Sequence, residues 1–332
     1  MGRRSALRAG SLAVAGLAGA LGVLGACRSA PTPAGTGKAP RVVFISAKPS
    51  DSFVTAIKRG ADFAAEEYGL DYVFQAPNST TFPELIQVTL AAIAERPDGM
   101  AINYYDRTFE DSTTRALDAG IAVVLYTNNR FEGENAPSDP RIRELGFVGQ
   151  DESTSGEKLA RAFMPRIPAG AAVLYVNPYP MFPTLAMRRD SVARVLEPAG
   201  HSVQTLNLDN SGDEGKYLVV IGPYLQAHPE VGAVISGGTS GANPTAKYVA
   251  DNKLSLPIAT FDVGQTTSNY IRQGIIDVAI NQQPFLEGYL AVANLALNLK
   301  YGLQPVNVNT GTQLVDKSNV ERVLQLIAEG KG

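Results

Sequence analysis

The chain has 332 residues, with 29 lysines and arginines against 32 aspartates and glutamates, and a formal net charge of −3. This mildly acidic balance argues against a nucleic-acid partner, because phosphate contacts need clustered lysine and arginine. Cys27 is the only cysteine, so the folded part must be stabilised by its hydrophobic core and not by internal disulfides.

Residues 1–26 have the pattern of a secretory signal peptide. A basic start that includes Arg3 and Arg4 precedes an apolar run over residues 10–24, which is too short and too rich in glycine for a spanning helix. The run ends in Leu-Gly-Ala before Cys27, which resembles the lipobox of bacterial lipoproteins, whose cysteine is diacylated and becomes the mature N-terminus. We therefore expect lipidation at Cys27; the alternative is an uncleaved N-terminal anchor. The arginine pair leaves both general secretion and twin-arginine export open.

Residues 27–40 should form a flexible tether between the lipid and the folded body. They are rich in proline, glycine, serine and threonine, and only Arg28 and Lys38 are charged, so they cannot bury a core. Two acyl chains on Cys27 suffice for durable anchoring. We expect an extracytoplasmic protein held at a membrane surface, with 26 basic and 32 acidic residues once the three arginines of the leader are removed. Which membrane carries the anchor stays open.

The body from Arg41 onward alternates short β-rich runs with helical stretches over roughly 290 residues, enough for two domains. In the first half, the strands are predicted at residues 41–46, 71–75, 99–102, 122–126 and 145–148. A helix is predicted over residues 52–68, closed by Gly69, and apolar residues recur at helical spacing over residues 82–93. In the second half, the strands are predicted at residues 172–176, 202–206, 232–235, 257–261 and 276–280.

Apolar strands separated by helices indicate parallel sheets covered on both faces, and ten or so strands suit two sheets of about five. Ligands of such sheets lie at the carboxyl ends of the strands. Those ends hold short carboxylates, amides and aromatic residues, in the segments 46–53, 103–106, 127–129, 149–151, 177–180, 237–239, 262 and 281–283. Such groups suit a ligand with many hydroxyls. Each alone could be an ordinary turn residue, but together they favour a binding site.

The ordered motifs resemble those of the periplasmic sugar-binding proteins of the ribose and xylose type, over about residues 41–320. The resemblance is carried by the segment 51–53 with Gly60, Gln87, Asp98-Gly99, Asp106, the segment 120–124, the segment 148–151 with Gly156, Arg188 with Ser191, the segment 260–262, the segment 282–284 with Gly288, and the tail 309–320. It implies a type I periplasmic binding protein, with two doubly wound parallel-sheet lobes joined by a three-stranded hinge.

The resemblance also implies lobe boundaries and a function. The N-terminal lobe would comprise residues 41–149 and 283–311, and the C-terminal lobe residues 150–282 and 312–332. The protein would act as a monomer without cofactor or metal. It would capture a sugar or polyol between two closing lobes and deliver it to the permease of an ABC transporter. The alternative is a receptor that presents its ligand to a sensor protein, and the sequence does not separate the two.

Several ligand contacts follow from the family's motifs. The resemblance assigns hydroxyl or ring contacts to Asp51, Phe53, Asp106, Asn128, Arg188, Asp262 and Gln282. Further candidates are Tyr105, Phe182 and Gly238. Two departures leave the particular sugar open. Gly237-Gly238-Thr239 replaces a common Asn-Asp pair, and Val54 replaces the second aromatic residue of a Phe-Phe pair.

Two rival classes find little support in the residues. An enzyme would need a triad or metal site, but neither His201 nor His228 is placed for one, and the segment 238–241 is not a nucleophile elbow. We therefore expect no catalytic residues. A sugar-responsive repressor would carry an N-terminal helix-turn-helix, where this chain has a leader and a tether.

Overall fold

The computed structural model describes residues 38–47, 52–79, 81–129, 131, 133–311 and 313–331. The chain from Ala39 onward forms one compact unit. The predicted leader, Cys27, all of the tether before residue 38, and Asp51 lie outside the described residues. Within the described ranges, no helix is long and apolar enough to cross a membrane.

In the described part of the chain, the N-terminal lobe is built on a six-stranded parallel sheet. Its strands follow one another in space as β11 (Val308–Asn309), β5 (Phe147–Gly149), β4 (Ala122–Asn129), β3 (Gly99–Tyr104), β1 (Arg41–Ile45) and β2 (Asp71–Gln75). Every residue of β3 is buried, because helices cover both faces of the sheet, as parallel sheets require.

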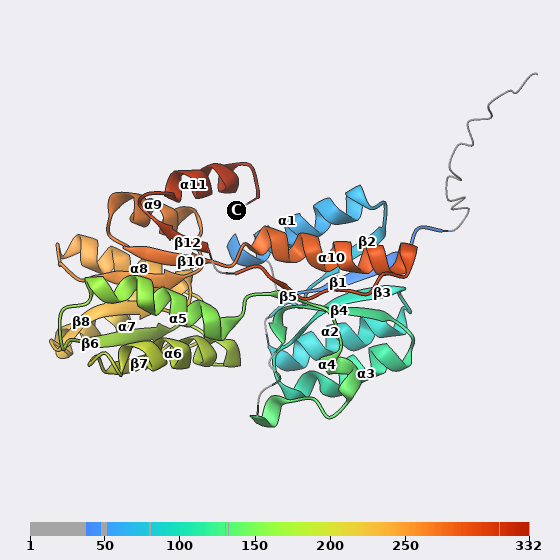
Figure 1. Ribbon diagram of the computed structural model, residues 1–332, viewed down its shortest axis with the longest axis horizontal. Helices are drawn as coiled ribbons and strands as arrows, with labels where there is room; N and C mark the ends of the chain where they lie inside the picture. Colours follow the sequence, from blue (N-terminus) through green and yellow to red (C-terminus); the bar gives the residue numbers. More distant parts are fainter. Residues whose placement is uncertain are drawn as a thin grey trace, which may run out of the picture. The chain divides into compact units, whose positions relative to one another are not determined.

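Helices α1 (Ser52–Glu67) and α10 (Pro284–Tyr301) lie side by side on one face of this sheet, and α2 (Phe82–Ala94) and α3 (Glu110–Asp118) cover the other (Figure 1). The short helix α4 (Pro140–Arg143) precedes β5. Glycines let α1 and α10 approach closely, since a Cβ on Gly60 would lie 1.9 Å from the carbonyl oxygen of Phe285. This packing fixes the start of α10 against α1.

The C-terminal lobe repeats the arrangement around a second sheet of six described strands. Their order is β12 (Gln313–Asp316), β10 (Val278–Asn281), β9 (Ile258–Phe261), β8 (Val231–Ser236), β6 (Ala172–Asn177) and β7 (Val203–Asn207). Helices α5 (Glu152–Phe163) and α6 (Pro183–Leu196) pack on one face. The other face is covered by α7 (Glu214–Ala227), α8 (Thr239–Asp251), α9 (Gln265–Gln273) and α11 (Val320–Ala328). Single 3-10 turns lie at Arg107–Phe109, Gly133–Asn135 and Met164–Arg166.

The predicted fold class, two parallel-sheet α/β lobes, is confirmed, with one difference in the sheets. Each sheet has a sixth strand because the tail contributes β11 to the first and β12 to the second. The chain leaves β11 in one sheet and enters the other from the opposite direction, so β12 pairs antiparallel with β10. Along the described chain, three connections pass between the sheets, from β5 to α5, from β10 to α10 and from β11 to β12.

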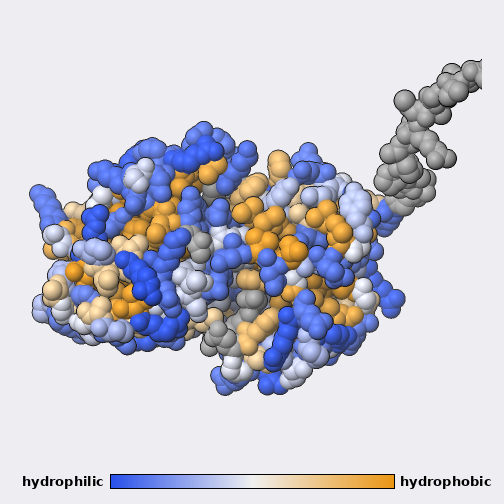
Figure 2. Space-filling view, in the orientation of Figure 1, coloured by the Kyte–Doolittle hydropathy of each residue, from blue (hydrophilic) through white to orange (hydrophobic). Residues whose placement is uncertain are grey.

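The surface is mostly hydrophilic on the face shown in Figure 2, with apolar patches among the polar side chains, including one over α1 and α10. Phe63 on α1 is 52% exposed and packs against Phe285 and Tyr289 of α10, with ring centroids 6.1 Å apart in each pair. These contacts add to the glycine-mediated approach of the two helices.

Candidate functional site

Residues at the carboxyl ends of the two sheets touch one another across the lobes. Tyr105, which follows β3, stacks on Phe182, which precedes α6, with ring centroids 5.2 Å apart. At the start of α9, a Cβ on Gly264 would lie 2.8 Å from the hydroxyl oxygen of Ser52 at the start of α1. The polar strand ends predicted from the sequence therefore lie on facing edges.

Arg188 on α6 is the centre of a buried charge network in the C-terminal lobe. Its side chain donates from Nε to Glu152 Oε2 at 2.6 Å, from Nη2 to Glu152 Oε1 at 2.9 Å and from Nη1 to the carbonyl oxygen of Gly237 at 2.8 Å. Nη1 also lies 3.7 Å from Asp262 Oδ2, and the guanidinium sits over the Phe261 ring. Burial lowers the pKa of Arg188, but the two carboxylates more than offset this, so its pKa is raised and it stays charged.

Asp262 and Gln282 join this network from the ends of β9 and β10. Asp262 adopts a left-handed backbone conformation with φ of 67°, which aspartate tolerates better than most residues. Its Oδ1 accepts a hydrogen bond from the Gln282 amide. Gln282 is 2% exposed, and its Oε1 has no hydrogen-bond partner among the described residues. A buried acceptor of this kind suits a ligand hydroxyl, because leaving it unpaired costs free energy.

At the facing edge of the N-terminal lobe, two amide side chains pair with each other. Asn128, near the end of β4, is 6% exposed and donates from Nδ2 to Oδ1 of Asn103 on β3 at 2.7 Å. The two amides hold each other in place through this bond, and amides can both donate to and accept from a hydroxyl. This amide pair is thus available at the strand ends of the N-terminal lobe, as the charge network is in the C-terminal lobe.

Of the other predicted ligand residues, Gly238 lies beside the charge network, whereas Phe53 and Asp106 have other contacts. Phe53 is partly buried and packs into the core between α1, α10 and the first sheet. Asp106 caps a 3-10 turn, accepting from the backbone N–H of Thr108 at 2.8 Å. A Cβ on Gly238 would lie 3.4 Å from Asp262 Oδ2, so this glycine borders the charge network.

The structure adds buried glutamates that the sequence did not single out. Glu152 lies two positions after Gln150, which the sequence motifs include. Its position directly after the first crossover could have indicated that it belongs to the site. Glu287 is fully buried in the first turn of α10, where Oε2 accepts from Thr127 at 2.5 Å and Oε1 from Thr310 at 3.3 Å. Acidic residues are common in the first turn of a helix, so the sequence around Glu287 did not indicate that it is buried. Burial raises the pKa of Glu287 to about 8.

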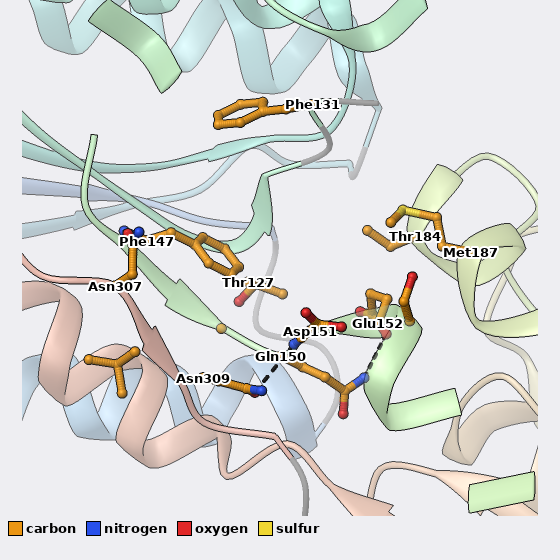
Figure 3. A pocket seen from close by; sticks show the side chains of 13 residues that line it. Thr127, Phe131, Phe147, Gln150, Asp151, Glu152, Thr184, Met187, Asn307 and Asn309 are labelled. Carbon is orange, nitrogen blue, oxygen red and sulfur yellow. Dashed lines mark hydrogen bonds between the residues drawn. The ribbon is translucent and has the colours of Figure 1, made fainter. Parts of the chain in front are cut away.

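A cavity of about 500 Å³ adjoins the charge network. It is lined by Thr127, Phe131, Phe147, Gly149, Gln150, Asp151, Glu152, Ser153, Thr184, Met187, Asn307, Val308 and Asn309. Figure 3 shows Phe147 and Thr127 from the N-terminal lobe opposite Thr184 and Met187 of α6, with Glu152 between them. None of the sequence-predicted ligand residues lines this cavity, but Glu152 is shared by the cavity and the Arg188 network.

In the described part of the chain, no three or more histidine, cysteine or acidic side chains are grouped so that they could hold a metal ion. The polar groups around Arg188 pair with one another and with backbone carbonyls. Their donors and acceptors suit hydrogen bonding to an organic ligand.

Two parallel-sheet lobes, three connections between them and polar strand ends on facing edges define the class of two-lobed, type I binding proteins. The chain belongs to the family described as the periplasmic binding protein domain, whose sequence profile matches residues 42–303. The family expected from the sequence motifs is thereby confirmed.

Similar proteins agree with this assignment. The chain is 25% identical over 301 residues to the xylose/arabinose-binding protein XylF of Sulfolobus acidocaldarius, covering 86% of this chain and 73% of that protein. A periplasmic sugar-binding protein of an ABC transporter from Legionella pneumophila is 26% identical, with a TM-score of 0.74, and covers 82% of this chain and 99% of its own. A carbohydrate transporter protein from Acidothermus cellulolyticus, solved with myo-inositol, is 26% identical, with a TM-score of 0.75, covering 88% and 98%.

Proposed function

We propose that this protein is an extracytoplasmic solute-binding protein that captures a sugar or polyol between its lobes and delivers it to the permease of an ABC transporter. One observation carries the ligand class. The side chains of Arg188, Asp262 and Gln282 form a polar cluster at the strand ends of the C-terminal lobe, and within it the buried Gln282 Oε1 has no hydrogen-bond partner among the described residues. Two similar proteins support it, one of them named for binding the pentoses xylose and arabinose and the other solved with the polyol myo-inositol.

Capture proceeds by closure of the lobes in this proposal. The lobes are residues 41–149 with 283–311 and residues 150–282 with 312–332, a division that the membership of the strands in the two sheets supports. A ligand that contacts both lobes stabilises the closed state relative to the open state, so binding shifts the population toward closure. The permease then recognises the closed pair of lobes. The protein itself performs no chemistry on the ligand and acts as a monomer.

The proposed ligand contacts are ordered by their place in the network. Arg188, Asp262 and Gln282 contact hydroxyls from the C-terminal lobe and the hinge, and Asn128 contacts them from the N-terminal lobe. Phe53, Tyr105 and Phe182 offer aromatic surface, to which the apolar face of a sugar ring binds. Asp51, Asp106 and Gly238 complete the set.

Replacing Asp262 tests the site. In the variant Asp262→Ala, isothermal titration with D-xylose, L-arabinose and myo-inositol should show about a 10- to 150-fold loss of affinity for any of these ligands that binds the wild type, since a charged hydrogen-bond partner contributes roughly 1.5–3 kcal/mol. The matched control is Asp251→Ala, whose side chain is 57% exposed at the end of α8. Undiminished affinity in Asp262→Ala would remove Asp262 from the site.

We also propose that Cys27 carries the lipid that anchors the protein outside the cytoplasm. The support is the leader pattern over residues 1–26 and the tether behind it. Metabolic labelling with palmitate in a bacterial host should label the wild type and not Cys27→Ser. Equal labelling of both would refute this anchor.

A further inference from the structure

We propose that the cavity of about 500 Å³ beside the Arg188 network is a second sugar subsite, so that the protein captures a glycoside such as a disaccharide and not only a single ring. The inference rests on the proposed function and names the ligand class of that site more closely. None of the sequence-predicted ligand residues lines the cavity, although Glu152 belongs to both places. A single ring at the network therefore leaves this space unused.

The cavity is present although the two lobes touch each other. Tyr105 of the N-terminal lobe stacks on Phe182 of the C-terminal lobe with ring centroids 5.2 Å apart, and Ser52 lies close to Gly264. The cavity lies between residues of β5 and β11 in one lobe and the starts of α5 and α6 in the other (Figure 3). Its volume falls within the roughly 300–1,000 Å³ that small-molecule sites have. There is thus room for a further ring.

Helix α6 connects the cavity with the charge network. Thr184 lines the cavity and is buried, and it lies one turn before Arg188, so the two side chains share a face of the helix. One turn of a helix rises about 5.4 Å, which is comparable to the length of one sugar unit. A ring bound at Arg188 therefore lies next to the cavity, and a glycosidic bond can carry a second ring into it.

Two amides in the wall of the cavity offer hydrogen-bond donors. Asn307 and Asn309 flank the central residue of this wall, Val308 of β11. Each uses its Oδ1 to accept a backbone N–H, Asn307 from Phe147 at 2.9 Å and Asn309 from Asp151 at 3.3 Å. Neither Nδ2 group has a protein partner within the described residues. Both can therefore donate to the hydroxyls of a ligand.

An aromatic ring and a buried acceptor complete the wall. The ring of the partly buried Phe147 lies against Gly149, where a Cβ would approach its Cζ to 2.5 Å. Such a surface suits the apolar face of a sugar ring. Gln150 is 2% exposed and donates from Nε2 to Glu152 at 2.6 Å, while its Oε1 has no partner among the described residues. Donors, an acceptor and an aromatic ring together fit a second sugar better than a purely apolar group.

Pairs of ligands isolate the contribution of the second ring. The pairs are D-xylose and xylobiose, L-arabinose and arabinobiose, D-glucose and cellobiose, and myo-inositol and galactinol, each a monomer and a glycoside that contains it. By isothermal titration, we expect the wild type to bind the glycoside of at least one pair about tenfold or more tightly than its monomer, because the second ring adds hydrogen bonds and aromatic contact. Phenyl β-D-xyloside, which has an apolar ring in place of the second sugar, should gain less than xylobiose.

Two variants test whether the second ring lies in the cavity. Met187→Trp fills the cavity from α6, so the ratio of glycoside to monomer affinity should fall by about tenfold or more. Asn307→Asp keeps the oxygen that accepts from Phe147 but replaces the Nδ2 donor, so the ratio should fall about three- to tenfold. The matched control, Val219→Trp, places the same large side chain on α7, where Val219 is 69% exposed, and should leave both affinities unchanged.

The outcomes separate this inference from the proposed function. If monomers bind and no glycoside binds more tightly than its monomer, the cavity takes no second ring, although sugar capture stands. If a glycoside gains affinity but both variants leave the ratio unchanged, the second ring lies elsewhere and the inference is wrong. If phenyl β-D-xyloside gains as much as xylobiose, the cavity takes an apolar group and not a sugar. If neither monomers nor glycosides bind, the proposed function fails and the inference falls with it.

Discussion

Two glutamates are buried near the junction of the lobes, and they differ in what surrounds them. Glu152 is 5% exposed and forms a bidentate ion pair with Arg188. Glu287 is fully buried, and its carboxyl oxygens accept from the hydroxyls of Thr127 and Thr310. The first therefore has a cation as its partner, and the second has neutral groups.

The difference shows that burial alone does not decide the role of an acidic residue. Burial disfavours the charged form of any carboxyl group. At Glu287 this effect prevails over the two hydroxyl hydrogen bonds and raises the pKa to about 8, with the charges of Asp262 and Glu152 adding to it. Glu152 instead forms a bidentate ion pair with the guanidinium of Arg188. The carboxyl group of Glu152 thus belongs to the charge network. The carboxyl group of Glu287 joins α10 to β4 and to the third crossover through hydrogen bonds with Thr127 and Thr310.

The largest expected effect comes from removing the cation. Arg188→Met should lower the free energy of unfolding by about 3–5 kcal/mol, because the buried carboxylate of Glu152 would lose its bidentate cation. The measurement is the urea unfolding midpoint, followed by circular dichroism. The substitution leaves Glu152 without a cationic partner, as Glu287 is, so the two buried glutamates can be compared directly.

A double variant serves as the control for this experiment. Combining Arg188→Met with Glu152→Gln also removes the buried charge of Glu152, so it should recover part of the lost stability. If the free energy of unfolding falls by less than about 1 kcal/mol in the single variant, or does not recover in the double variant, Arg188 does not stabilise the charged carboxylate of Glu152.

The second prediction, with a smaller effect at neutral pH, concerns Glu287. Its pKa is raised from 4.5 to about 8, so between these pH values the native state keeps a proton that the unfolded chain has released. The stabilising contribution is fully present below pH 4.5 and is lost as the pH rises through about 8. The neutral isostere Glu287→Gln should therefore melt at a temperature that exceeds that of the wild type by an increasing margin from pH 5 to pH 9.

Thr310→Val is the matched control for the Glu287 titration. It removes the hydroxyl that donates to Oε1 of Glu287 but leaves the carboxyl group in place. The steep loss of stability with pH should persist in this variant and disappear only in Glu287→Gln. If wild type and Glu287→Gln keep a constant difference in melting temperature across this range, Glu287 does not titrate there, and the contrast between the two glutamates is lost.

Much of the fold and part of the site could be predicted from the sequence. Strand ends carry polar residues at known edges of parallel sheets, so Asp262 and Gln282 could be placed together before their contact was seen. The sequence did not predict that the tail forms one strand in each sheet, because strands of 2 and 4 residues are too short to show a clear apolar periodicity. The aromatic contact between Tyr105 and Phe182 joins distant segments and depends on how the lobes meet.

By itself, the sequence determined the alternation of buried strands and helices, the number of lobes and the chemistry available at their edges, since these follow from local patterns of apolar and polar residues. Only the tertiary structure decided that Arg188 forms an ion pair with Glu152, 36 positions earlier in the chain. It also decided that the carboxyl group of Glu287 accepts hydrogen bonds from two hydroxyls. The physical reason is that the charge of a buried group depends on distance and desolvation, and both are set by packing between segments far apart in the sequence.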